Sequence, residues 1–444
     1  MKFPTIAAEF PPVLRRVALI MVAMMAGSLA FTLYMTHRLE FPIPFGVVWI
    51  SGDQQWCDFR AFQERSMQFR TAAYWLEYDY PMTYPAAVAV ILAMFYKLPH
   101  PLRVFLTVLF AGWIAWVIWF ARGLAQRGIP TAQAVAFALV ILLTTWPVYY
   151  QFDTANIEGI MAIVLFIGIL AVLRGGSGVW SWTGTSLIAL AGAMKLFPAI
   201  MFALLLSKRR YKECAAGVVL MGILNYGSLA IVGPSMSAAQ HHIKDGFRFL
   251  RDNFITPRVS LQLNFSHALY MPIKYGVLLV DRLLRYGGKH GPQAHEIALV
   301  ESTLSIYMVV MAVVGITLYF WRIRKLPMLN QVIALTVCAV LFTPFSSDYT
   351  LNHLLLPLSL MFFYVVEKWN EGIKVPGIET SFACMCIILG FSTFFTIYYG
   401  FENVFRCLAL CVLLVTALRF PFYWSQLDAV DATGQHFAPA AKES

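Results

Sequence analysis

The chain has 444 residues, of which 59% are hydrophobic and 13% are charged. A soluble domain carries about 25% charged and about 45–50% apolar residues, so this composition excludes a single water-soluble core and predicts a polytopic membrane protein. The formal net charge of +10 suits basic cytoplasmic loops better than nucleic-acid binding. The sequence contains no dinucleotide-binding glycine motif, no P-loop and no tandem repeat, so no motif in it couples ATP to work.

Twelve apolar segments are long enough to be spans, which need about 20 mostly apolar residues. A weaker thirteenth segment, 267–284, contains Lys274, Asp281 and Arg282. The expected fold is therefore all-α, with about 12–13 transmembrane helices in a single domain over residues 1–425. In chain order, the twelve predicted spans are 15–36, 84–99, 101–121, 133–150, 156–173, 183–206, 213–233, 298–321, 329–346, 350–366, 378–399 and 403–420.

Basic residues set the predicted orientation, because cytoplasmic loops of membrane proteins are enriched in Lys and Arg. The basic clusters at 208–212 and 322–325 then lie inside, together with both termini. The loops 37–83 and 234–297 lie on the non-cytoplasmic side. We expect residues 426–444 to form a disordered cytoplasmic tail.

Two features do not fit this orientation. Arg122 and Arg127 fall on the outside, and Asp153 falls on the inside. A short span that enters and leaves on the same side would reconcile them.

The first outer loop contains an acidic and aromatic stretch, 52–85, which a simple connection between two helices would not need. Aromatic neighbours of Asp58 would desolvate it and raise its pKa, while Arg60 beside it would lower the pKa. We therefore interpret Asp58 as a general base; the alternative is a solvated acid paired with Arg60 or Arg65. Residues 61–78 have helical spacing, which predicts an amphipathic helix on the outer leaflet or a helix packed on the bundle.

Lys195 lies near the middle of the predicted span 183–206. A charged lysine at mid-membrane costs at least about 2.5–3.5 kcal/mol, so it requires a partner or an aqueous cavity. We interpret it as a cation for a lipid phosphate; the alternative is a buried ion pair with an acid such as Glu158. Asn156 and Glu158 begin another span, and Glu158 is expected to face the bundle because exposure to lipid would be costly.

Three further polar residues lie in or near outer connections. Asn264 follows a basic loop and also matches a glycosylation sequon. Asp348 is placed to cap a helix. His353 lies about one turn into the next span, where it either donates to a substrate phosphate or bonds a neighbouring carbonyl. The cysteines lie mostly in apolar segments and the acids are dispersed, so we expect neither a metal nor a cofactor.

Five segments, in this order and spacing, resemble glycosyltransferase family 87, a set of polytopic enzymes with the C-type glycosyltransferase fold. The resemblance runs over roughly residues 15–400. In the second segment, Thr154-Ala155 replaces the Arg-Gly of the family pattern Asp-Arg-Gly-Asn-x-Glu. The five segments are Asp58-Phe59 with Tyr84-Pro85, Asp153-x-x-Asn156-x-Glu158-Gly159, Lys195-x-x-Pro198, Asn264-x-Ser266 and Asp348-Tyr349.

This resemblance implies transfer of a sugar, typically mannose, from a polyprenyl-phosphate donor to a glycolipid or glycan acceptor on the non-cytoplasmic face. Asp58 would deprotonate the acceptor hydroxyl, and the lipid phosphate would leave with inversion at the anomeric carbon. The expected location is the plasma membrane of a bacterium, where such chemistry builds cell-envelope glycolipids. The residues expected to bind substrate are Arg60, Asn156, Glu158, Lys195, Asn264, Asp348 and His353.

Two other functions remain open on the sequence. A polysaccharide polymerase or glycolipid ligase would use a diphosphate-linked donor, and such proteins usually place a large basic loop late in the chain, as 234–297 could be. A lipid or sugar transporter without chemistry would also tolerate charge at mid-membrane. The lack of two similar halves counts against a transporter.

Overall fold

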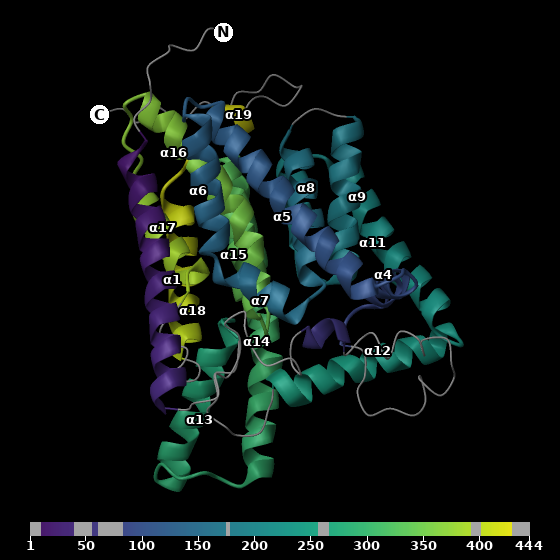
Figure 1. The fold of residues 1–444 in the computed structure, drawn as a ribbon. Coiled ribbons are helices and arrows are strands. Elements are labelled where there is room, and N and C mark those ends of the chain that lie inside the picture. The colour runs from purple at the N-terminus through teal and green to yellow at the C-terminus, as the bar shows by residue number, and fades with distance from the viewer. Residues whose placement is uncertain are drawn as a thin grey trace.

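The computed structural model describes residues 10–39, 56–60, 83–174, 178–255, 266–391 and 401–428, and every regular element within them is helical (Figure 1). In this part of the chain, five segments are long and apolar enough to cross a membrane, and six shorter helices are also apolar. Each of the twelve predicted spans, and the weaker thirteenth, contains a helix, so the all-helical polytopic fold is confirmed. The helices are α1 (Pro12–Leu39), α4 (Ala86–Tyr96), α5 (Pro101–Ala125), α6 (Thr131–Leu143), α7 (Trp146–Thr154), α8 (Glu158–Leu173), α9 (Val179–Met194), η1 (Phe197–Met201), α10 (Phe202–Ser207), α11 (Tyr211–Val232), α12 (Met236–Leu250), η2 (Arg251–Ile255), α13 (Tyr270–Tyr286), α14 (Gln293–Trp321), η3 (Ile323–Lys325), α15 (Met328–Leu341), η4 (Asp348–Leu354), α16 (Leu355–Asn370), α17 (Ile378–Leu389), α18 (Phe401–Arg419) and α19 (Ser425–Asp428).

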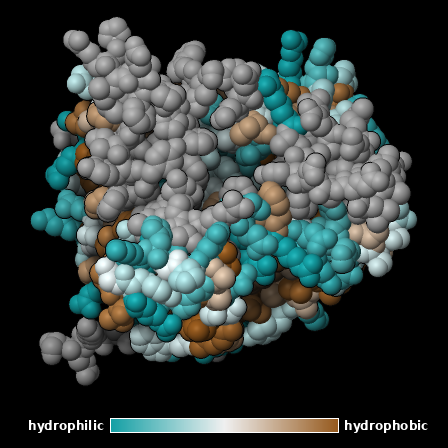
Figure 2. Space-filling model, turned by 90° about the horizontal axis from the view of Figure 1, so that it is seen from below, coloured by the Kyte–Doolittle hydropathy of each residue, from teal (hydrophilic) through white to brown (hydrophobic). Residues whose placement is uncertain are grey.

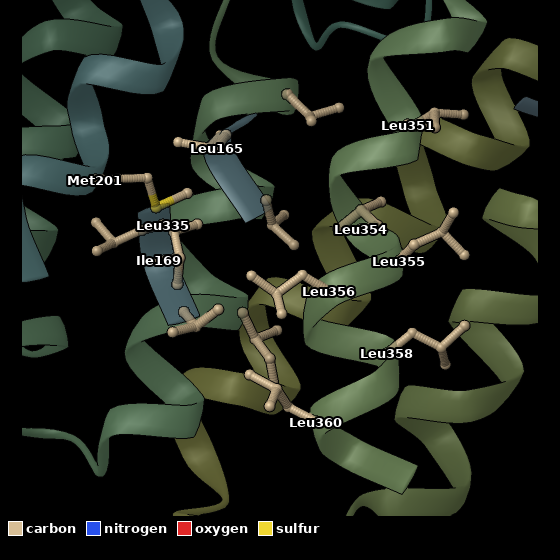
Figure 3. Packing of buried hydrophobic residues seen from close by; sticks show 14 of the residues in the cluster. Leu165, Ile169, Met201, Leu335, Leu351, Leu354, Leu355, Leu356, Leu358 and Leu360 are labelled. Atoms are coloured by element: carbon tan, nitrogen blue, oxygen red, sulfur yellow. The ribbon is translucent and has the colours of Figure 1, made fainter. Parts of the chain in front are cut away.

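The centre of the bundle is formed by α16 and the 3-10 turn η4 before it, whose side chains are almost all buried. Their leucines pack in one core with Leu165 and Ile169 of α8 and Leu335 of α15 (Figure 3). By contrast, α14 exposes much of its apolar surface, including Ile306 and Val313. Apolar side chains on the outside of a helix favour a lipid environment.

The helix α4 is too short to cross a bilayer. Its 11 residues span about 16 Å at 1.5 Å per residue, whereas the hydrocarbon core is about 30 Å thick. Tyr84 precedes α4 and Asn156 precedes α8, and the Asn156 amide donates a hydrogen bond to the Tyr84 hydroxyl at 3.0 Å. The chain therefore leaves this end of the bundle in α5 and returns to it in α6 and α7.

This arrangement corrects the predicted topology, because 84–99 is not a crossing span. The Asp153 carbonyl accepts a hydrogen bond from the Trp56 N–H at 2.7 Å, so Asp153 lies on the same side as the first loop. Arg122 then lies at the far end of α5, away from that loop. Arg122, Arg127 and Asp153, which did not fit the predicted orientation, therefore fit once 84–99 does not cross. In Figure 1, α4 and α7 lie toward the lower end, which we call the site end, whereas the start of α1 and the short helix α19 lie toward the top.

An amphipathic helix, α12, runs across the site end (Figure 1). It buries Ala239, His242 and Gly246 on one face and exposes polar residues such as Lys244 and Arg248 on the other. Seen from below, this end carries many hydrophilic side chains, with hydrophobic ones at its rim (Figure 2). The amphipathic helix predicted at 61–78 lies outside the described residues.

The segment 267–284 forms α13, which projects from the site end beside the start of α14 (Figure 1). The two helices are joined by a buried ion pair in which Arg282 Nε lies 2.8 Å from Glu296 Oε1. That 267–284 belongs to a non-cytoplasmic loop stays a prediction; in the structure the segment lies at the site end, as α12 does.

Candidate active site

The short helical turn at 57–60 is held against the bundle by its backbone and by Phe59. Trp56 has a left-handed backbone, with φ of 60°, and it precedes the turn. The Phe59 side chain is buried, lies 4.9 Å from the ring of Phe105 and 5.0 Å from that of Tyr96, and its carbonyl accepts a hydrogen bond from the Tyr96 hydroxyl at 2.9 Å. These contacts place Asp58 where α7 ends and α8 begins.

The Asp58 carboxylate is partly exposed and accepts a hydrogen bond from the Asn156 amide at 2.7 Å. Burial raises the pKa of Asp58 above its ordinary value, while the hydrogen bond from Asn156 and the charge of Lys195 oppose the rise. Arg60 lies 5.5 Å from the centre of the Trp56 ring. The sequence left open an ion pair between Asp58 and Arg60, but the described hydrogen-bond partners of the carboxylate, Asn156 and Thr154, are uncharged.

The turn between α7 and α8 explains the position of Asn156. Ala155 closes α7 in a left-handed conformation, with φ of 50°, and its N–H returns to the Gln151 carbonyl. The Asn156 side-chain oxygen then accepts a hydrogen bond from the Glu158 N–H at 2.8 Å, which satisfies a free donor at the start of α8. An added Cβ at Gly159 would lie 0.9 Å from Gln151 Nε2, so a larger residue here would displace the buried Gln151 side chain.

Lys195 does not lie in the middle of a helix, which corrects the sequence prediction. The helix α9 ends at Met194, Lys195 has an extended backbone, and η1 follows. Lys195 forms an ion pair with Glu158, whose other oxygen accepts a hydrogen bond from the Thr350 hydroxyl at 2.8 Å. This pair is the alternative that the sequence left open. The Lys195 side chain is still 27% exposed, whereas that of Glu158 is 1% exposed.

Asp348 is held by three residues and is 4% exposed. The Trp146 indole donates to Oδ2 at 2.6 Å, and Arg406 donates to Oδ1 at 2.8 Å. His267 Nδ1 lies 3.8 Å from the same Oδ1, and its other ring nitrogen lies 2.8 Å from the Ser346 hydroxyl. Both carboxylate oxygens are thus engaged within the protein.

His353 is buried with its ring 5.1 Å from that of Phe197. Among the described residues its Nε2 has no hydrogen-bond partner. Lys195 is close enough to His353 to interact with it electrostatically. A buried ring nitrogen without a partner requires an explanation, and a substrate oxygen would provide one.

The structure therefore brings most of the predicted site residues together, in three groups. Asp58 and Asn156 form one group with Tyr84, Glu158 and Lys195 form a second with Thr350, and Asp348 forms a third with Arg406 and His267. Asn264 lies outside the described residues. No group of three or more His, Cys, Asp or Glu side chains in the described ranges is arranged to hold a metal ion.

Arg406 was not predicted from the sequence. It is 1% exposed and lies within the apolar segment 403–420. A charged residue in a predicted span is costly unless it has a partner, so the charge that marks Lys195 in the sequence also marks Arg406 as a residue that needs a partner.

A family model, described as glycosyltransferase family 87, matches residues 82–347, which is more than half of the chain. The chain therefore belongs to glycosyltransferase family 87, whose members are polytopic membrane enzymes with the C-type glycosyltransferase fold. It is a multi-pass membrane glycosyltransferase that uses a sugar donor and an acceptor. No curated protein and no solved structure matches it. The matched range contains Asn156, Glu158 and Lys195, whereas Asp58, His353 and Arg406 lie outside it.

Proposed function

We propose that this enzyme transfers a hexose, with mannose as the first expectation, from a polyprenyl-phosphate donor to a glycolipid or glycan acceptor. The observation that carries the proposal is the Asp58 carboxylate. It is partly exposed, held by the Asn156 amide and the Thr154 side chain, and lies within electrostatic range of Lys195. A base and a cation at one site are what displacement of a phosphate by a hydroxyl requires.

In the proposed reaction Asp58 takes the proton of the acceptor hydroxyl. The acceptor oxygen then forms a bond with the anomeric carbon, and the bond from that carbon to the phosphate oxygen breaks. The electron pair leaves with the lipid phosphate, and the configuration at the anomeric carbon inverts. A positioned general base contributes roughly 10²–10⁴-fold to the rate.

Lys195 and His353 are the groups we propose for the leaving phosphate. The Lys195 side chain is 27% exposed although it is paired with Glu158, and the buried Nε2 of His353 has no partner among the described residues. A cation and a nitrogen donor aimed at the leaving oxygen would stabilise the charge that develops there. We assign Asn156 and Glu158 to positioning, because their polar atoms are engaged with Asp58 and Lys195. We assign Asp348 to the stability of the fold, because it neutralises the buried Arg406.

The basic residues support an active site on the non-cytoplasmic face. With α4 kept at the site end, Arg122 and the clusters 208–212 and 322–325 all fall at the end opposite Asp58. Cytoplasmic loops carry this excess of Lys and Arg. We therefore propose that the site end faces away from the cytoplasm, in the plasma membrane of a bacterium.

The test is sugar transfer by the purified protein in lipid vesicles, with mannose attached to a polyprenyl monophosphate or to a polyprenyl diphosphate. Acceptors would be a pool of glycolipids and short glycans, and Asp58→Asn would be the matched inactive control. We expect a new glycosidic bond from the monophosphate donor with wild type only. Transfer from the diphosphate donor alone would instead indicate a polymerase or ligase. Movement of donor across the vesicle membrane with no product would indicate a transporter.

A further inference from the structure

Two tyrosines that were not among the predicted site residues lie between the charged groups of the site. Tyr150 of α7 and Tyr349 of η4 stack with ring centres 5.7 Å apart and planes inclined by 13°. Both side chains are partly exposed, whereas every other residue of η4 is buried. Tyr349 is thus the residue through which η4 contributes a surface to the site.

The charges around the pair show where this surface lies. Asp58 is close enough to interact electrostatically with both tyrosine hydroxyls. The Lys195 ammonium lies over the Tyr349 ring, 5.8 Å from its centre. A group that reached from the proposed base to the proposed phosphate site would therefore pass the Tyr349 ring.

We propose that the Tyr349 ring is the wall against which the transferred hexose lies, with Tyr150 supporting it. The inference rests on the proposed function and adds the sugar subsite to it. The hexose would lie between the acceptor oxygen at Asp58 and the phosphate at Lys195, because its anomeric carbon bonds to one and then to the other.

An aromatic ring suits this position for two reasons. Its face carries partial negative charge, which attracts the weakly positive C–H groups on one side of a pyranose ring. Glycosyl transfer also passes through an oxocarbenium-like transition state, whose positive charge is stabilised over an aromatic face. The Lys195 ammonium over the same ring indicates that a cation in this part of the site meets the face of Tyr349.

The experiment compares Tyr349→Leu and Tyr349→Phe with wild type, using polyprenyl monophosphates that carry mannose or glucose. For each donor, kcat and KM are measured, and folding is checked by thermal unfolding. We expect Tyr349→Leu to lower kcat by roughly tenfold and to change the ratio of kcat/KM between the two donors. Tyr349→Phe keeps the ring face and should keep the ratio. Tyr226→Leu, a change at an outward-facing tyrosine of α11 that is 61% exposed, is the matched control.

The outcomes separate this inference from the proposed function. If wild type transfers sugar and folded Tyr349→Leu keeps both its kcat and its donor ratio, the tyrosine pair is packing only and the inference is overturned. An equal loss with both donors, and an unchanged ratio, would also overturn it, since a sugar wall must distinguish the two rings. If Tyr349→Leu does not fold, a changed ratio in Tyr150→Leu supports the inference and an unchanged one rejects it. Absence of transfer by wild type from any monophosphate donor would remove the proposed function and this inference with it.

Discussion

Asp58 and Asp348 are two carboxylates at the same end of the bundle, and their surroundings differ. Asp348 is 4% exposed and receives the Trp146 indole at 2.6 Å on one oxygen and Arg406 at 2.8 Å on the other. Asp58 is partly exposed, and its hydrogen-bond partners are uncharged: the Asn156 amide at 2.7 Å on Oδ2 and the Thr154 side chain. The Oδ1 of Asp58 lies 3.9 Å from the thiol of Cys57, a weak donor.

This difference separates a structural acid from a chemical one. A carboxylate whose oxygens are filled by an arginine and an indole is strongly held in its ionised form and has no room for a proton from outside. A carboxylate that is partly exposed, has uncharged partners and has a pKa raised by burial can accept a proton from a substrate. Both acids were predicted as site residues, and only their partners distinguish them.

The largest expected effect is that of Asp58→Asn. Loss of the base should lower transfer by roughly 10²–10⁴-fold. Folding should not suffer, because burial disfavours the charged form of Asp58 and the neutral amide avoids that cost above the ordinary pKa. Activity and thermal unfolding, measured on one preparation, would test whether activity is lost while stability is kept. A variant that retained full activity would remove Asp58 from the mechanism.

The second largest expected effect is that of Asp348→Asn, which should lower stability and leave turnover nearly unchanged, the reverse of Asp58→Asn. Arg406 would lose its counter-charge at a site where it is 1% exposed, and breaking a buried ion pair costs about 3–5 kcal/mol. We expect a clear fall in the unfolding temperature and near-normal turnover in the protein that remains folded. The double variant Asp348→Asn with Arg406→Leu should recover much of the stability. Lost turnover at unchanged stability would instead place Asp348 in the chemistry.

The helices could be predicted from the sequence, because each span is an apolar run of sufficient length. The side of the membrane on which a short helix ends could not be predicted, since hydropathy does not say whether 11 apolar residues cross the membrane or return to the side where they began. That required the hydrogen bond between Tyr84 and Asn156, which joins positions 72 residues apart. For the same reason Lys195 was predicted inside a helix, whereas the chain breaks at that residue.

The candidate site was predicted in part. Asp58, Glu158 and Lys195 stand out because charge near or within an apolar span requires a partner. Their pairing, and the saturation of Asp348 by Arg406 58 residues further along the chain, depend on how the helices pack. Tyr349 belongs to the segment Asp348-Tyr349 that resembles the family, but its role could not be predicted, because a tyrosine near a span end is ordinary in a membrane protein.

A smaller effect concerns the influence of Asn156 on the pKa of Asp58. The amide lowers the pKa that burial raises, so Asn156→Ala should raise it further. Transfer needs the ionised base, and the acidic limb of the pH–rate profile should therefore move to higher pH, by about one unit for a hydrogen bond to a charged group. Tyr84→Phe, which changes only a partner of Asn156, should move it less. A profile that shifted to lower pH would contradict this role for the amide.

The smallest effect tests the turn that presents Asn156 to Asp58. Ala155 is 2% exposed and has φ of 50°, a conformation that costs a residue with a side chain roughly 1–2 kcal/mol. The family pattern has glycine at this place, where the backbone strain is absent. Ala155→Gly relieves the strain and loses one buried methyl, worth about 0.8 kcal/mol, and it also gives the unfolded chain more freedom, so we expect a net change close to zero. The same substitution at Ala162, inside α8, should destabilise by about 1 kcal/mol. Thermal unfolding of the two variants measures the contrast, and equal losses would mean that the left-handed turn stores no strain and that Asn156 is held by its hydrogen bonds alone.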